Sequence, residues 1–132
     1  MRGEWEMDSL DYSQQVRDRF ERPANAGRLL GPVISGAAGE EGLGTRVEFD
    51  FRLRSGTVEE SAFRVYGCPH AIAAASWVAE NARDRRLDDT SWMDPLRLAA
   101  LLEVPEHKLG VLLVVQDALE AAAAKFDQSE DR

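Results

Sequence analysis

One stretch of the chain, residues 63–80, constrains the fold more than any other, because it joins a strand to a helix through a single cysteine. Apolar and polar residues alternate over Phe63–Tyr66, and this period of two indicates a β-strand. Gly67 interrupts the alternation, and Pro69 suits the first turn of a helix, where a backbone N–H has no partner to lose. Beyond it, apolar residues recur at helical spacing, at Ala71, Ile72, Ala75 and Val78. The sequence therefore predicts that Cys68 lies between the end of a strand and the start of a helix.

This position is chemically favourable for Cys68, the only cysteine of the chain. The unpaired N–H groups and the positive dipole end of a helix N-terminus favour a thiolate, which is the form that attacks sulfur and binds metals. Cys68 is therefore a candidate sulfur acceptor or metal ligand. The alternative is a cysteine that packs as a small apolar side chain.

The remaining patterns predict an α+β fold. We expect helices at Ser9–Arg22, Pro69–Asp84, Pro95–Glu103 and Lys108–Phe126, an edge strand at Leu29–Ile34, and a hairpin of Thr45–Arg54 with Thr57–Tyr66. Ser35–Gly44 holds glycines at 36, 39, 42 and 44 and is expected to be a flexible loop. Residues 1–132 then form a single domain, in which a three-stranded antiparallel sheet carries helices on one face, including a long C-terminal helix. Residues 1–8 and 127–132 are expected to be flexible tails.

Composition narrows the range of partners. The formal net charge is −8, which disfavours nucleic acids and anionic membrane surfaces. No apolar run reaches the length needed to span a bilayer. A single cysteine forms no internal disulfide, and this fits a reducing compartment, so we expect a cytoplasmic protein.

Three motifs carry a resemblance to a known family. The central one is Phe63-Arg-Val-Tyr-Gly-Cys68 followed by Ala71-Ile-Ala73. The first is Asp11-Tyr-Ser-Gln-Gln-Val16 with Phe20-Glu-Arg-Pro-Ala-Asn-Ala-Gly27, and the last is Lys108-Leu109 with Gln116-Asp-Ala-Leu119. In this order and spacing they resemble the IscU/NifU N-terminal family, the scaffolds for iron–sulfur cluster assembly. The resemblance implies the same α+β fold.

The resemblance also implies where metal ligands would stand, and this chain departs from it. The family uses three cysteines, an aspartate and a histidine. Here the first ligand motif, Cys-Gly-Asp, aligns with Leu43-Gly-Thr45, and the histidine and last cysteine align with Gly110 and Val111. A looser alignment places the first motif on Ala38-Gly-Glu40, which restores a carboxylate but no thiol. We prefer the former, because a one-residue slip would turn the apolar face of the next strand outward. Either way only Cys68 survives.

Histidine offers one further ligand. His70 follows Cys68 by two residues, so both could bind one metal, and two copies of the chain could supply four ligands in a homodimer. The alternative, which we favour, is an exposed histidine in the first helical turn.

The substituted positions also suggest a surface. Leu43, Val111, Leu112 and Val115 would form either an apolar protein interface or a patch that closes the former pocket. The sequence leaves both readings open.

Two functions follow as hypotheses. In the first, the chain is a divergent, non-enzymatic scaffold-like protein that binds sulfur, iron, zinc or an iron–sulfur cluster through Cys68 but does not assemble a cluster alone. In the second, it is an interaction or regulatory module that docks on a cysteine desulfurase or another assembly partner.

Overall fold

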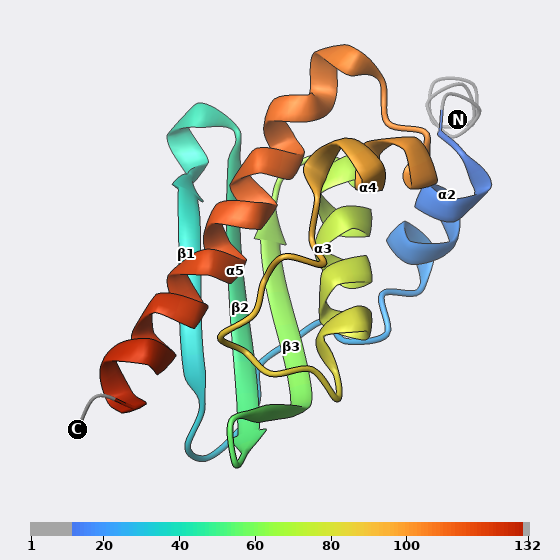
Figure 1. Ribbon diagram of the computed structural model, residues 1–132. Helices are drawn as coiled ribbons and strands as arrows, with labels where there is room; N and C mark the ends of the chain where they lie inside the picture. Colours follow the sequence, from blue (N-terminus) through green and yellow to red (C-terminus); the bar gives the residue numbers. More distant parts are fainter. Residues whose placement is uncertain (1–11, 131–132) are drawn as a thin grey trace.

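The computed structural model describes residues 12–130 and has the expected α+β architecture (Figure 1). Its elements, in order, are α2 (Gln14–Glu21), β1 (Ile34–Glu40), the 3₁₀ helix η1 (Glu41–Leu43), β2 (Thr45–Arg54), β3 (Thr57–Tyr66), α3 (Pro69–Ala82), α4 (Pro95–Leu102), the 3₁₀ helix η2 (Glu106–Lys108) and α5 (Leu109–Glu130). The three strands form one antiparallel sheet in the order β1-β2-β3. The predicted sheet, hairpin and long C-terminal helix are confirmed.

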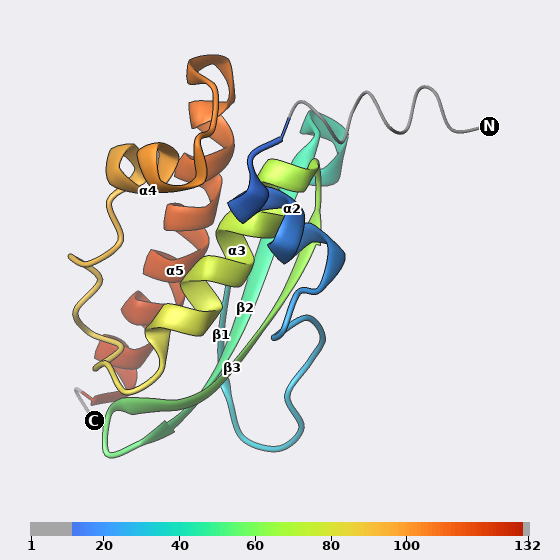
Figure 2. The ribbon, with the colours of Figure 1, turned by 90° about the vertical axis from the view of Figure 1, so that its right-hand side faces the viewer.

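One face of the sheet carries the core. Val47, Phe49 and Phe51 of β2 have no exposed surface, because alternate side chains of a strand point to the same face. The helices α3, α4 and α5 lie on that side of the sheet, and the loop before β1 lies on the other (Figure 2). The inward side of α5 is apolar along its length, with Leu112, Val115, Leu119, Ala122 and Phe126 all buried. The hydrophobic core therefore sits between the sheet and this helical layer.

The position of β1 corrects the sequence prediction. The edge strand is Ile34–Glu40 rather than Leu29–Ile34, so most of the expected flexible loop Ser35–Gly44 is a strand and a 3₁₀ turn. Close packing against α5 explains the glycine at position 36. A Cβ atom built on Gly36 would lie 2.3 Å from the backbone N of Ala122 and 2.5 Å from the carbonyl O of Ala118. Only a glycine lets α5 approach β1 this closely.

The helix boundaries also differ in part from those predicted. Ser13 caps α2, its Oγ accepting from the N–H of Val16 at 3.2 Å, while the start of the expected helix at Ser9 lies outside the described residues. At the other end, α5 continues to Glu130, so residues 127–130 belong to a helix rather than a tail. Within residues 12–130, no helix combines the length and apolar character needed to cross a lipid bilayer.

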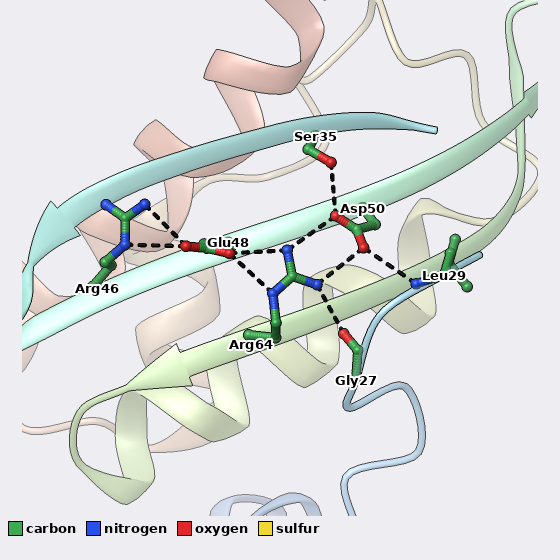
Figure 3. A network of polar contacts seen from close by, with 7 residues as sticks. All are labelled: Gly27, Leu29, Ser35, Arg46, Glu48, Asp50 and Arg64. Carbon is green, nitrogen blue, oxygen red and sulfur yellow. Dashed lines mark hydrogen bonds and ion pairs between the residues drawn. The ribbon is translucent and has the colours of Figure 1, made fainter. Parts of the chain in front are cut away.

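On the face of the sheet opposite the helices, an ion-pair network holds Gly27 and Leu29 of the loop before β1 (Figure 3). Arg64 on β3 donates to Asp50 Oδ2 at 2.9 Å, Asp50 Oδ1 at 3.0 Å and Glu48 Oε1 at 2.9 Å. It also donates to the carbonyl of Gly27 at 2.9 Å, and the N–H of Leu29 donates to Asp50 at 3.2 Å. The charged side chains of β2 and β3 therefore pair across the strands and also hold the loop before β1.

Asp50 is the buried centre of this network, with 4% of its surface exposed. Burial raises the pKa of its carboxyl, but hydrogen bonds from Arg64, from the Ser35 hydroxyl and from the Leu29 N–H outweigh burial and lower the pKa to about 2. The pKa of Glu48 is lowered as well, first by its hydrogen bond from Arg64. The folded state therefore prefers both carboxylates ionised.

A substitution at Gly36 tests the close contact between α5 and β1. We expect Gly36→Ala to lower the free energy of unfolding by about 1–3 kcal/mol, because the added methyl collides with helix backbone that cannot rotate away. Gly42→Ala is the matched control, since a Cβ there meets nothing within 4 Å, and its effect should stay within about 0.5 kcal/mol. Urea denaturation measures both. Equal effects at the two sites would contradict the close contact.

The pH dependence of stability tests the network. An unfolded aspartate has a pKa of about 3.9, whereas folded Asp50 has one of about 2. Its contribution of about 2 kcal/mol is therefore complete above pH ~4 and is lost as the pH falls toward 2. We expect Asp50→Asn to be less stable than the unsubstituted chain at pH 7 and to lose less stability between pH 5 and 2, measured by denaturation at each pH.

Glu59→Gln is the control for this pH series. It removes an exposed carboxylate that pairs with Arg54 at 3.3 Å on the neighbouring strand, and exposed pairs of this kind contribute little. Its pH profile should follow that of the unsubstituted chain. A flat acid profile of the unsubstituted chain would contradict the role given to Asp50.

Candidate functional site

A cleft of about 460 Å³ lies at the end of the sheet where the β1–β2 turn meets the first residues of α5. The turn side contributes Gly39, Glu40, Leu43, Gly44 and Thr45. The helix side contributes His107, Lys108, Gly110, Val111 and Val114. Cys68 lies on the same cleft, at the junction of β3 and α3. Residues that are far apart in the sequence thus share one depression.

Cys68 occupies the position that the sequence predicted. It is the N-cap residue of α3, with an extended backbone (φ −84°, ψ 170°), and Pro69 opens the helix. Its side chain makes no capping hydrogen bond, and it is partly exposed. The thiol is therefore accessible from the cleft and is not engaged in holding the helix end.

The positions that the family resemblance singled out converge on the cleft. Leu43 and Thr45 line it from one side and Gly110 and Val111 from the other, with Cys68 between them. Leu43 has 84% of its surface exposed and forms part of the rim. This convergence is compatible with the alignment that places Leu43-Gly-Thr45 on the first ligand motif.

Under the looser alignment, Ala38-Gly-Glu40, two of the three residues line the cleft. Gly39 and Glu40 line the cleft, whereas Ala38 does not and pairs with Val47 inside the sheet. Under that alignment the cleft would receive the carboxylate of Glu40, while the position of the first cysteine would lie away from the cleft.

The residues present do not fit a four-coordinate metal centre or cluster. Such centres need about four sulfur, nitrogen or oxygen donors, and clusters are held mainly by thiolates. The cleft offers one thiol, together with His107 and Glu40, while Leu43 and Val111 have no donor atoms. In the part of the chain that the structure covers, no three His, Cys, Asp or Glu side chains are grouped so that they could hold a metal ion.

His70 lies apart from this cleft and is buried, with 4% of its surface exposed, so the expectation of an exposed histidine is wrong. Its ring packs edge-on against Tyr12, with centroids 4.8 Å apart. Neither ring nitrogen has a hydrogen-bond partner among the described residues. Burial lowers the pKa of His70, and the charges of Lys108 and His107 lower it further. The lowered pKa favours the neutral imidazole, and both of its ring nitrogens are without a hydrogen-bond partner among the described residues.

The expected apolar interface is corrected in part. Leu112 and Val115 are fully buried on the inner side of α5, so they belong to the core and cannot contact a partner. Leu43 and Val111 remain at the cleft, and Val114 joins them there.

Sequence reasoning missed three residues that line the cleft. Lys108 entered it only as part of a motif, and His107 falls between the last two expected helices. Val114 is the third, although its spacing of three residues from Val111 places both on one side of a helix.

Comparisons with known proteins show which family the sequence is similar to. A family model described as NifU-like N terminal domain matches residues 11–132. The iron–sulfur cluster assembly scaffold protein IscU of Escherichia coli is 30% identical over 126 residues, which cover 92% of this chain and 98% of that protein. IscU of Azotobacter vinelandii is 29% identical over 121 residues, covering 89% and 94%.

Solved structures show the same fold. A NifU-like protein (N-terminal) from Brucella abortus superposes with a TM-score of 0.62 at 18% identity, covering 91% of this chain and 94% of that one. A candidate scaffold protein for the SUF system from Fervidobacterium islandicum gives a TM-score of 0.67 at 14% identity, covering 86% and 97%.

Substitution of ligand residues into the cleft tests whether these positions lie close enough together to bind one metal ion. We expect the triple variant Leu43→Cys, Thr45→Asp, Val111→Cys to bind one Zn²⁺ or Co²⁺ per chain, because three thiolates and a carboxylate would then face one cleft. The sulfur-to-cobalt absorption band and metal analysis measure this binding.

The matched control places the third cysteine elsewhere on the same helix. Leu113→Cys replaces Val111→Cys in the triple variant, at a position that is 46% exposed and does not line the cleft. This control should bind at least about tenfold more weakly. Equal affinity of the two variants would show that the cleft does not gather these positions.

Proposed function

The chain belongs to the family of NifU-like N-terminal domains, and from that premise we propose that it is a scaffold-like protein of iron–sulfur cluster assembly that accepts one sulfur atom at Cys68. The observation that carries the proposal is the cleft, where the only thiol of the chain stands among positions that lack the other ligands. The protein is not an enzyme in this role, and it does not build a cluster by itself.

The sulfur step needs only one nucleophile. The Cys68 thiolate attacks the terminal sulfur of a persulfide on a donor such as a cysteine desulfurase. The sulfur–sulfur bond of the donor breaks as a new one forms on Cys68, and the donor cysteine leaves as a thiolate. No external oxidant or reductant is required. Lys108 and His107 line the same cleft as this thiol.

A second candidate is an interaction or regulatory module that docks on an assembly partner without using its thiol. The exposure of Leu43 at the rim favours it, because an exposed leucine beside Val111 gives an apolar contact surface in place of metal ligands. The two candidates differ in whether Cys68 is needed.

Sulfur transfer is tested with the purified chain, a bacterial cysteine desulfurase and cysteine under anaerobic conditions. We expect mass spectrometry to find one added sulfur atom, located on Cys68 and absent from Cys68→Ser. Absence of this persulfide would contradict the acceptor role. A desulfurase complex that survives Cys68→Ser, without any transfer to the unsubstituted chain, would instead support the interaction module.

Cluster assembly is tested in the same mixture after ferrous iron is added. We expect no visible cluster absorption and no stoichiometric iron and sulfide on this chain, because one thiolate cannot complete a cluster site. The Escherichia coli scaffold protein serves as the positive control. A stable cluster on this chain would refute the claim that it cannot assemble one alone.

A further inference from the structure

The two edges of the sheet differ in how their backbone groups are satisfied. Along β3, the N–H of Phe63 donates to the carbonyl of Asn25 at 3.0 Å, and the carbonyl of Phe63 accepts from the N–H of Gly27 at 2.9 Å. Further along, Val58 is bonded in the same way to Asp84 and Arg85, both at 2.8 Å. Two chain segments thus cover the β3 edge. No backbone segment among residues 12–130 pairs with the outer edge of β1.

The register identifies which groups of β1 point outward. The backbone groups of Phe63 on β3 point away from β2, toward Asn25 and Gly27. Phe49, which lies opposite Phe63 on β2, therefore directs its own backbone groups toward β1, where it pairs with Gly36. Backbone direction alternates along an extended strand, so the N–H and C=O groups of Ser35 and Ala37 point away from the sheet. Gly39 has a φ of +86°, outside the extended region, and its carbonyl accepts from Arg46 Nη1 at 3.2 Å.

Natural edges are protected by charges, prolines or bulges within the strand, or by a helix or loop that covers the edge. At Gly36, α5 lies against one face of β1, in the direction of a side chain rather than of the outward backbone groups. Here the stretch Ser35–Gly39 is uncharged and small, and β1 pairs with β2 without any register shift. The unpaired edge is therefore able to accept a further strand.

We propose that the β1 edge binds an extended, basic segment of a partner protein, which adds a fourth strand to the sheet. Backbone pairing supplies the affinity in this mode of recognition. Charge supplies the preference, because Glu40 and Glu41 are exposed at the end of β1, and neither has an ion-pair partner in the described part of the chain. The net charge of −8 acts in the same direction.

A second copy of this chain fits the edge less well than a peptide does. Each copy carries a net charge of −8 and exposes Glu40 and Glu41, so two copies repel each other at this edge, whereas a basic peptide is attracted.

The proposed strand would end beside the cleft. Gly39 and Glu40 belong both to β1 and to the cleft wall that faces Cys68. A partner segment that pairs with β1 would therefore carry its adjoining residues toward the thiol. The pairing itself uses no atom of Cys68, so it is independent of sulfur transfer.

The test uses a capped heptapeptide of alternating valine and lysine, titrated into the full chain and followed by isothermal calorimetry. We expect binding, with slowed amide exchange at Ala37. The same peptide with methylated backbone nitrogens should not bind, because it keeps its charge but loses its donors. A peptide of alternating valine and glutamate should bind more weakly. No binding by the lysine peptide, or equal binding by its methylated form, would overturn the proposal.

Two variants at one position locate the contact. Ala37→Pro removes an outward N–H that the sheet does not use and is tolerated on an edge strand, so peptide affinity should fall at least about tenfold. Ala37→Thr keeps the N–H and should bind within about twofold of the unsubstituted chain. Cys68→Ser should bind unchanged, which separates this proposal from sulfur transfer. Unaltered affinity of Ala37→Pro would overturn the proposal, as would self-association of the unsubstituted chain that Ala37→Pro abolishes.

Discussion

The contact between α5 and β1 is the constraint on which the rest of the structure depends. Gly36 lets the backbone of the helix rest directly on the strand, at distances that leave no room for a side chain. This contact fixes where α5 crosses the sheet. It thereby sets η2 with Lys108 and the first turn of α5 with Val111 against the junction that carries Cys68. The cleft is a consequence of helix packing rather than of any local motif.

The opposite face of the sheet is organised by charge instead of apolar burial. Arg64 bridges Asp50 and Glu48 and also holds the carbonyl of Gly27. A buried carboxylate without such partners would cost several kcal/mol, so each member of the network depends on the others. The result is a loop fastened across the back of the sheet, which pairs with β3 and leaves the β1 edge open.

A scaffold needs a cleft of suitable shape and a set of donor atoms within it. The shape is present, because residues from the β1–β2 turn, the β3–α3 junction and α5 converge there. Donor chemistry is largely absent, because Leu43 and Val111, which the family resemblance aligns with thiols, have no donor atoms. A single thiol is sufficient to receive one sulfur atom, but a cluster needs several ligands. The functional proposal follows from this difference, and the open strand beside the cleft adds a route by which a partner could approach it.

The sequence by itself determined the hairpin, the strand-to-helix junction at Cys68 and the apolar face of α5, because these follow from local periodicity and from glycine and proline chemistry. It also indicated the family and the positions that face the cleft. Only the tertiary structure decided that much of the glycine-rich segment is β1, since Gly36 packs against a helix more than eighty residues further along the chain. Burial of His70, Leu112 and Val115, and the ion pairs around Asp50, were likewise decided by packing between distant segments, which local patterns do not encode.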